Sequence, residues 1–372
     1  MKKVYLSRLI KCVSLVLPIV LIVLCLQNLL ILNDHNTQRI RDFYMEEENS
    51  LDVVFLGASE IYSGFAPGYA YEQHGFTSYM YTISANPGSL YKSQLKEVLS
   101  RQNPQLIMVE INGFLYVDNK RQANEVQLHQ FTDNIPMSEN KATTIFEHPS
   151  DNKENFLIPF FKYHSNWQKP ASMYKQLRKT FSEGDTPSVI KGLHTYTAIC
   201  QGLPANYATI PPSDYAITDM AKDYLVTFLE YCRENDLKVV FLNFPRILGG
   251  EKGDAFLSRV EEVEQIIRQY DYPFLDLQEK AEEIGIVFPS DFYNTHHLNI
   301  YGQQKMTRYL GDLITNEYHL RPMNQSEKNK ASWEECVLYT EQYFAYAEQC
   351  YRDNRVIWIS EDTFMEHLKA KK

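Results

Sequence analysis

The sequence lacks the patterns that mark most nucleic-acid-binding and zinc-binding proteins. Its 37 Lys and Arg are outnumbered by 47 Asp and Glu, which gives a formal net charge of −10, and the basic residues form no dense cluster. Because phosphate contacts need clustered cations, we do not expect a nucleic acid as partner. The six cysteines include no CxxC pair and have no histidine nearby at metal-ligand spacing, so we expect no zinc site and no other cofactor.

The composition is that of a folded protein with a large core. Hydrophobic residues make up 44% of the 372 residues and charged residues 23%, which excludes a disordered or fibrous chain. The 26 Tyr and 20 Phe add to the surface that such a chain can bury. The length suits one large α/β domain with insertions.

A long apolar run lies near the N-terminus, at residues 12–32. It is long enough to cross a bilayer at ~1.5 Å rise per residue, so we expect a transmembrane anchor. The alternative, a cleaved signal peptide, is disfavoured because no small-x-small cleavage site follows the run. Basic residues dominate residues 1–11, so the positive-inside rule predicts a cytoplasmic tail there and a large extracytoplasmic part held at the cell membrane by one span. Residues 33–50, which are polar, are expected to form a stalk.

Short apolar runs alternate with helical stripes along much of the remaining chain. This alternation predicts a three-layer α/β fold with a doubly wound parallel sheet of the flavodoxin type. The expected strands are residues 53–56, 78–83, 105–110, 239–242 and 273–277. The expected helices have apolar stripes over residues 90–99, 224–232, 256–267 and 301–314. We place this domain at residues 51–320, with an insertion at about 114–215 and a helical extension at 321–372.

Ser59 is the first candidate for chemistry. It lies in VVFLGASE, directly after the first expected strand, at the carboxyl edge where open α/β sheets bind ligands. A serine at such a turn can act as a nucleophile, and a helix N-terminus there can stabilise an oxyanion. The alternative is a helix N-cap with no catalytic role.

His297 is the second candidate. It lies in DFYNTHHLNIYGQQK, just before the last core helix, where it can meet the end of the first strand. A nucleophile and a base have to meet in space and not in sequence. The alternative is a loop histidine beside the helix cap Asn299, and His296 is less suitable because its side chain should point away.

Together these segments resemble the SGNH/GDSL hydrolase family. GASE and FYNTHHLNIYG are similar to the first and last blocks of that family. YHSNW at 163–167 and YLVTFLEYCRENDLKVVFLNFPR at 224–246 resemble its membrane-anchored bacterial branch, which includes DltD-type teichoic acid D-alanylation proteins. The resemblance covers most of residues 50–320 and implies that Ser59 is the nucleophile and His297 the general base.

The resemblance also implies oxyanion donors and an acid. The Gly of the second block best matches Gly88 in SANPGS, and the Asn of the third block best matches Asn112 in VEINGF, although the usual Gly-x-Asn-Asp is absent. The acid of the family lies three residues before the base, where this chain has Asn294. Three alternatives stay open: Asn294 holds the imidazole, Asp291 supplies the carboxylate, or Ser59 and His297 work as a dyad, with Asp291 then a turn or cap residue.

The expected function is ester chemistry outside the membrane. The resemblance implies a serine esterase or O-acyltransferase acting on acetyl or D-alanyl esters of a cell-envelope polymer. It also implies a multi-pass membrane O-acyltransferase as partner, while the N-terminal helix would contact membrane lipid. The alternative is a non-catalytic scaffold or glycan-binding accessory protein of such a system, which the loss of the acid at Asn294 suggests.

Overall fold

The computed structural model describes residues 2–31, 35–178, 188–204, 207 and 214–371. At its centre is a parallel sheet in the order β2-β1-β3-β5-β6, which confirms the predicted mixed α/β fold with a central parallel sheet. This order is typical of flavodoxin-like folds. The strands are β1 (Val53–Gly57), β2 (Ser78–Thr82), β3 (Leu106–Glu110), β5 (Val239–Asn243) and β6 (Phe274–Asp276).

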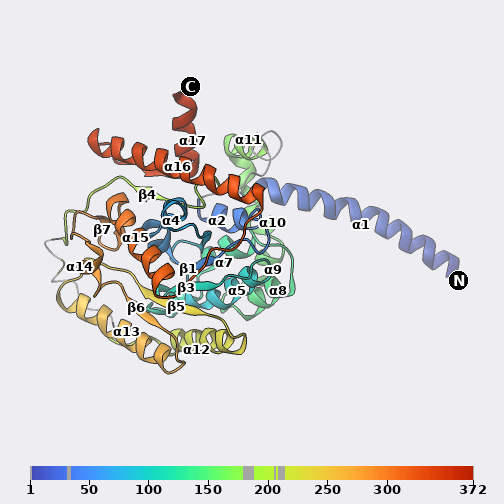
Figure 1. Cartoon of the computed structure of the whole chain (residues 1–372). Coiled ribbons are helices and arrows are strands. Elements are labelled where there is room, and N and C mark those ends of the chain that lie inside the picture. The colour runs from blue at the N-terminus through green and yellow to red at the C-terminus, as the bar shows by residue number, and fades with distance from the viewer. Residues whose placement is uncertain (1, 32–34, 179–187, 205–206, 208–213, 372) are drawn as a thin grey trace.

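Helices cover both faces of the sheet (Figure 1). Val54 and Leu56 of β1 belong to one apolar cluster and Val53 and Phe55 to another, because successive side chains of a strand point to opposite faces. Both faces are therefore buried, which explains the continuous apolar runs in the sequence. One face is covered by α5 (Gly88–Leu99), α12 (Asp219–Glu234) and α13 (Gly250–Arg268), and the other by α3 (Ser59–Gly64), α4 (Pro67–His74) and α15 (Ile300–Asn316).

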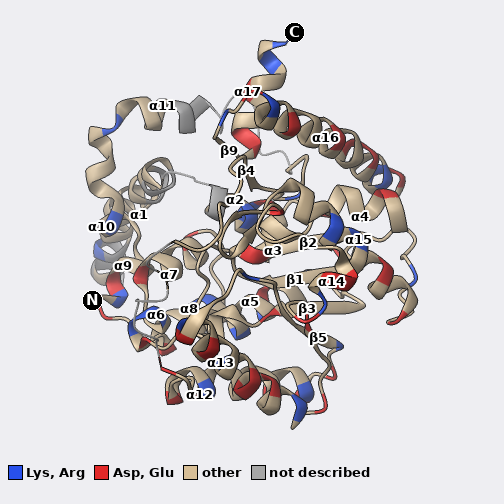
Figure 2. Cartoon of the chain, turned by 90° about the vertical axis from the view of Figure 1, so that its left-hand side faces the viewer, with Lys and Arg blue, Asp and Glu red and all other residues tan. Residues whose placement is uncertain are grey.

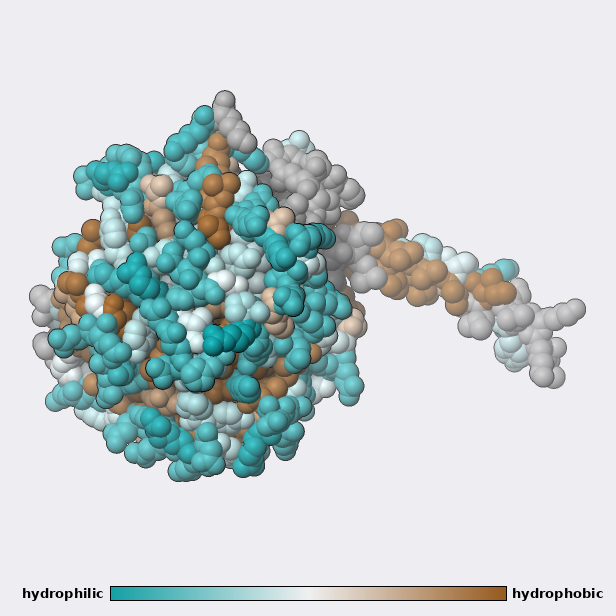
Figure 3. All heavy atoms as spheres, in the orientation of Figure 1, coloured by the Kyte–Doolittle hydropathy of each residue, from teal (hydrophilic) through white to brown (hydrophobic). Residues whose placement is uncertain are grey.

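The N-terminal helix α1 (Lys2–Leu30) extends away from this body, with hydrophobic residues along it (Figures 1 and 3). Its apolar side chains are exposed, for example Leu15 at 67% and Ile22 at 58%. Across the described residues, no helix is long and apolar enough to qualify as a membrane span. The anchor expected at residues 12–32 therefore stays a prediction, and residue 32 lies outside the described residues.

Residues 35–50 are part of the folded body, so the predicted stalk at 33–50 is wrong for this stretch. Helix α2 (His35–Phe43) buries Ile40 and Phe43 completely. The ring of Phe43 packs 5.5 Å from that of Tyr79 and 4.7 Å from that of Tyr81, both on β2. The polar composition of this segment concealed an apolar face that packs on the sheet.

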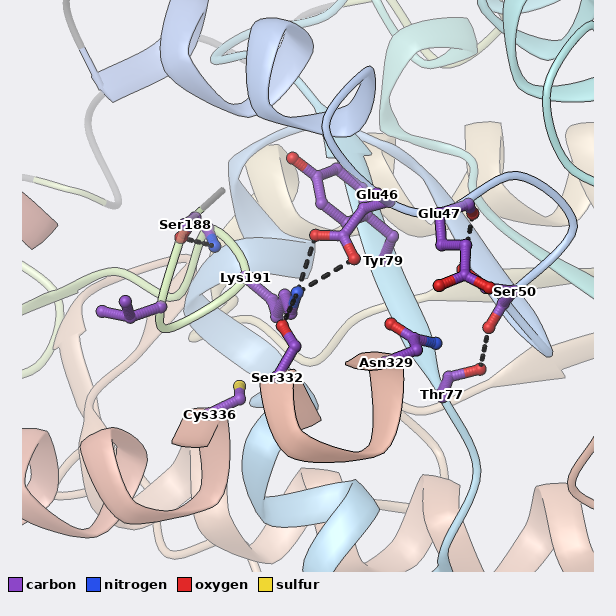
Figure 4. Close-up of polar contacts among 12 residues, drawn as sticks. Glu46, Glu47, Ser50, Thr77, Tyr79, Ser188, Lys191, Asn329, Ser332 and Cys336 are labelled. Carbon is purple, nitrogen blue, oxygen red and sulfur yellow. Dashed lines mark hydrogen bonds and ion pairs between the residues drawn. The ribbon is translucent and has the colours of Figure 1, made fainter. Parts of the chain in front are cut away.

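A buried ion pair holds the same segment in place (Figure 4). Lys191 Nζ lies 2.8 and 2.9 Å from the two carboxylate oxygens of Glu46, and both side chains are almost completely buried. The ammonium group also lies 3.4 Å from Ser332 Oγ and 5.1 Å from the ring centre of Trp333. Three distant stretches of the chain therefore meet at this pair.

The insertion and the C-terminal extension consist mainly of helices. The insertion follows η1 (Asn112–Phe114) and contains α6 (Asn119–Gln122), α7 (Glu125–Thr132), α8 (Glu139–Glu147), α9 (Lys153–Leu157), α10 (Phe160–Tyr163), η2 (His164–Gln168), α11 (Pro170–Arg178) and β4 (Thr195–Tyr196). The extension contains α16 (Glu327–Arg352), β9 (Trp358–Ile359) and α17 (Glu361–Ala370). Strands β4 and β9 pair antiparallel, which joins the two regions. Figure 2 shows acidic and basic residues interspersed along α12, α13 and α16.

The last core helix is preceded by a small hairpin. After α14 (Ala281–Ile284), strands β7 (Phe292–Asn294) and β8 (His297–Leu298) pair antiparallel and lead into α15. The hairpin is fixed from two sides, since Ile247 N donates to Thr295 O at 2.8 Å and Cys200 N donates to Phe292 O at 2.8 Å. Its position relative to β1 is thereby set by the loop after β5 and by the insertion.

Candidate active site

The predicted site residues gather at the carboxyl ends of β1 and β3. β1 pairs with β2 on one side and with β3 on the other, so the chain leaves β1 and β3 in different directions. Ligands of open α/β sheets bind at such a topological switch point. Ser59 begins α3 directly after β1, and Asn112 begins η1 directly after β3. Both side chains are partly exposed, whereas the strands behind them are buried.

A glycine makes the turn to Ser59 possible. Gly57 has φ +154°, and a Cβ atom there would lie 2.7 Å from Glu110 Cβ and 2.6 Å from Ile61 Cδ1. A side chain at this position would therefore displace either β3 or α3. The strand ends closely packed against its neighbour, and Ser59 emerges at the first position of α3.

His297 lies within hydrogen-bonding distance of Ser59. Its Nε2 is 2.6 Å from Ser59 Oγ, although the two residues are 238 positions apart. The ring of Tyr293 stacks on the imidazole with centroids 5.1 Å apart and an interplanar angle of 6°. This contact restricts rotation of the imidazole and keeps Nε2 directed at the serine. The structure thus brings the predicted nucleophile and the predicted base together.

Asn294 contacts the other nitrogen of the imidazole. Its Oδ1 lies 3.0 Å from His297 Nδ1 and also accepts the backbone N–H groups of His296 and His297, each at 3.0 Å. Because backbone N–H groups only donate, they fix the amide oxygen, and not the amide nitrogen, toward the hairpin. Nδ1 must then carry the ring proton, which leaves the lone pair of Nε2 to accept the proton of Ser59.

The surroundings keep the imidazole neutral. Burial, followed by the neighbouring His296 and Arg246, lowers the pKa of His297 well below its usual range. A neutral imidazole is the form that can act as a general base. Asn294 adds no negative charge that would raise this pKa.

Asp291 lies in a different arrangement from the one required of a catalytic acid. Its carboxylate Oδ2 accepts the backbone N–H of Val287 at 2.8 Å and pairs with Lys305 Nζ at 2.7 Å. Its backbone oxygen accepts the N–H of Asn299. These contacts hold the loop before α15, so the structure places Asn294 and not Asp291 against the imidazole.

The two predicted oxyanion donors, Gly88 and Asn112, lie in segments that pack against each other. Gly88 begins α5, and a Cβ atom there would lie 2.6 Å from the ring of Phe114 and 3.2 Å from Gly113 O. Gly88 is therefore packed directly against the loop that starts at Asn112. The roles of the Gly88 N–H and the Asn112 amide as oxyanion donors stay predictions.

The sequence analysis did not identify three charged residues that lie near this site. Arg246, in the loop after β5, forms an ion pair with Glu60 and donates to Asn112 Oδ1 at 2.7 Å. Glu110, the last residue of β3, accepts from the backbone N–H groups of Ala58 at 2.8 Å and Asn112 at 2.7 Å. We call Glu60, Glu110 and Arg246 the charged cluster. The signal was available: each of the three neighbouring strands β1, β3 and β5 ends at or near a charged residue.

Burial shifts the protonation of the two glutamates. It raises the pKa of Glu60, which the nearby Arg246 partly offsets. Burial and the nearby Glu60 raise the pKa of Glu110 well above its usual value. Two carboxyl groups this close disfavour double ionisation. Within the described ranges, no group of three or more His, Cys, Asp or Glu side chains is arranged to hold a metal ion.

Known proteins add little to this geometry. No family model matches the chain, and no curated protein matches it. Among solved structures, the crystal structure of an extracellular lipase from Streptomyces rimosus is similar, with a TM-score of 0.30 and 13% sequence identity. The match covers 70% of this chain and 99% of the lipase. At this TM-score the similarity does not identify a function.

Proposed function

We propose that the protein is a serine esterase or O-acyltransferase with Ser59 as nucleophile. The observation that carries this proposal is the hydrogen-bonded array Ser59–His297–Asn294, with distances of 2.6 and 3.0 Å. A serine bonded to a neutral imidazole whose second nitrogen is held by a third side chain is the arrangement of an activated nucleophile. The resemblance to SGNH/GDSL hydrolases supports the same assignment.

The reaction would proceed through a covalent acyl-enzyme. Ser59 Oγ attacks the acyl carbonyl carbon while His297 Nε2 takes the serine proton. The oxyanion is stabilised by the Asn112 amide and the Gly88 N–H. Collapse of the tetrahedral intermediate releases the alcohol, which receives the proton from His297. His297 then removes a proton from water or from a polymer hydroxyl, whose oxygen attacks the acyl carbonyl carbon. The second tetrahedral intermediate collapses with release of Ser59 Oγ, which takes this proton back from His297.

The amide of Asn294 has a specific consequence for this scheme. In a serine protease triad, replacing the aspartate by asparagine lowers kcat by ~10⁴, because the amide stabilises the wrong imidazole tautomer. Here two backbone N–H groups orient the Asn294 oxygen toward the ring, so the productive tautomer is retained. What is missing is only the negative charge that would stabilise the imidazolium.

We place this chemistry outside the cell membrane, on acetyl or D-alanyl esters of an envelope polymer. The exposed apolar side chains of α1 and the basic residues in its first eleven positions support an anchor with residues 1–11 in the cytoplasm. The family resemblance supports the substrate class and a multi-pass membrane O-acyltransferase as partner.

Protease added to intact protoplasts should degrade the large domain. Degradation only after lysis would reverse this topology.

The second candidate is a non-catalytic scaffold or glycan-binding accessory protein. It is favoured by the uncharged Asn294 at the position where the resembling family has its acid. Labelling of the full chain in detergent with a fluorophosphonate separates the two candidates. An activated Ser59 should react and Ser59→Ala should not, whereas equal absence of labelling in both proteins would favour the scaffold.

A further inference from the structure

On the basis of the ester chemistry proposed above, we propose that the charged cluster is a positioning device. Glu110 joins the nucleophile turn to the oxyanion loop, and Arg246 determines which end of the Asn112 amide faces the substrate. Neither residue would touch the reacting atoms, so both act through Ser59 and Asn112.

Glu110 connects two loops that must keep a fixed distance from each other. One carboxylate oxygen accepts the N–H of Ala58, the residue before Ser59, and the other accepts the N–H of Asn112. A carboxyl group can offer an acceptor at both ends, whereas a glutamine would turn its NH₂ group toward one of these N–H donors. Glutamine therefore keeps the shape of this side chain but loses one of the two bonds.

The position of Glu110 is itself closely determined. The residue is 1% exposed and lies at the end of β3, paired in register with Leu242 of β5. A Cβ atom at Gly57 would lie 2.8 Å from its Oε2, so the carboxyl group reaches the nucleophile turn only because residue 57 is glycine. The distance between the two loops is therefore set by the sheet.

Arg246 fixes the orientation of the Asn112 amide. A guanidinium group only donates hydrogen bonds, so the atom of Asn112 that it contacts at 2.7 Å must be the amide oxygen. The amide nitrogen of the partly exposed Asn112 then points away from Arg246 and can donate to an oxyanion. Arg246 is held in turn by Glu60, by the ring of Phe256 at 4.5 Å and through its backbone N–H, which donates to Gln278 Oε1 at 2.6 Å.

The net charge of the cluster suits this task. Glu60 and Glu110 are 3% and 1% exposed, and Arg246 supplies one positive charge for the two carboxyl groups. Because burial disfavours two negative charges side by side, one of the carboxyl groups retains its proton. The cluster can then fix both loops without placing a net negative charge beside the oxyanion.

A double variant separates positioning from stability. Arg246→Met alone leaves the buried Glu60 unpaired and should lower the melting temperature. Glu60→Gln/Arg246→Met removes both charges and should recover most of that loss. We expect kcat for a small acetyl ester to stay reduced about 10²-fold in both variants, as for loss of an oxyanion donor, with KM within about twofold. Arg246→Lys, which can still donate to Asn112, should recover part of kcat.

The controls use the full chain in detergent. The matched double variant Glu46→Gln/Lys191→Met changes the other buried ion pair, away from Ser59, and should keep the wild-type kcat. If Ser59-dependent turnover is present and Glu60→Gln/Arg246→Met keeps or recovers wild-type kcat, the positioning role is overturned while the esterase proposal stands. If the wild-type protein has no turnover that Ser59→Ala removes, the esterase proposal fails and the positioning role with it.

Discussion

The two buried ion pairs of this protein have the same chemistry but different surroundings. Glu46–Lys191 and Glu60–Arg246 each place a carboxylate against a cation, and the four side chains are 2%, 1%, 3% and 15% exposed, respectively. The further contacts of Lys191 go to Ser332 and Trp333, which belong to the outer helix α16. Those of Arg246 include a hydrogen bond to Asn112, at the candidate active site. What a buried ion pair contributes thus depends on where its remaining hydrogen bonds lead.

The largest expected effect is on turnover at the candidate active site, near the pair Glu60–Arg246. Ser59→Ala should reduce turnover of a small acetyl ester by at least ~10⁴-fold, because no other group in the array can form the acyl-enzyme. Stability should change by ~1 kcal/mol or less, the range of a helix-terminal serine. Steady-state kinetics with a thermal melt checks both. Ser290→Ala, at an exposed turn, serves as control, and substantial turnover by Ser59→Ala would refute the assignment.

The next effect concerns the stability of the protein and tests the other ion pair, Glu46–Lys191. Lys191→Met leaves Glu46 buried and unpaired, which should lower the free energy of unfolding by about 3–5 kcal/mol. The double variant Glu46→Gln/Lys191→Met should be close to the wild type. Denaturant unfolding followed by the fluorescence of Trp333 and its neighbours measures this difference. If Lys191→Met were as stable as Glu46→Gln/Lys191→Met, Glu46 would not be buried away from water as the structure shows.

A smaller effect concerns the charge missing at the imidazole. Asn294→Asp should raise kcat/KM roughly tenfold, equivalent to about 1.4 kcal/mol, because a carboxylate stabilises the developing imidazolium.

The same variant should change the pH profile. In the wild type the pKa of His297 lies well below its usual range, so the ring stays neutral and active as the pH falls through about 6.5. Asn294→Asp raises this pKa, so the acid limb of the profile should move to higher pH. An acid limb at the same pH in both proteins would contradict the contact between residues 294 and 297.

The smallest effect is expected at Asp291. Its carboxylate pairs with Lys305 and accepts the backbone N–H of Val287. Asp291→Asn should therefore lower the free energy of unfolding by about 1–2 kcal/mol. Turnover should change less than about threefold, since the imidazole is held by Asn294. Parallel measurement of kcat and of the melting temperature tests this separation. A loss of turnover by several orders of magnitude would restore Asp291 as the catalytic acid.

Much of the sheet could be predicted because each strand is a short buried run with a clear end. Ser59 and His297 could be proposed because both lie next to such ends. The choice between Asn294 and Asp291 could not be made, since it depends on a hairpin in which residue 294 pairs directly with residue 297.

The contacts within the charged cluster could not be predicted from the sequence, because they join distant parts of the chain. Glu60, Glu110 and Arg246 follow different strands, and only the strand order β1-β3-β5 brings them together. The segment at 35–50 is polar in composition, and the sequence does not show that Glu46 is neutralised by Lys191 from another part of the chain.

The separation of 238 residues between Ser59 and His297 makes their contact a mark of complete folding. Ser59 emerges from β1, but its base arrives on a hairpin held by the loop after β5, by the insertion and by Tyr293, whose ring meets Trp358 of β9 at 5.4 Å. A nascent chain that has formed only β1 to β3 has Ser59 without the imidazole beside it. The proposed nucleophile therefore meets its proposed base only when the last elements of the chain have docked.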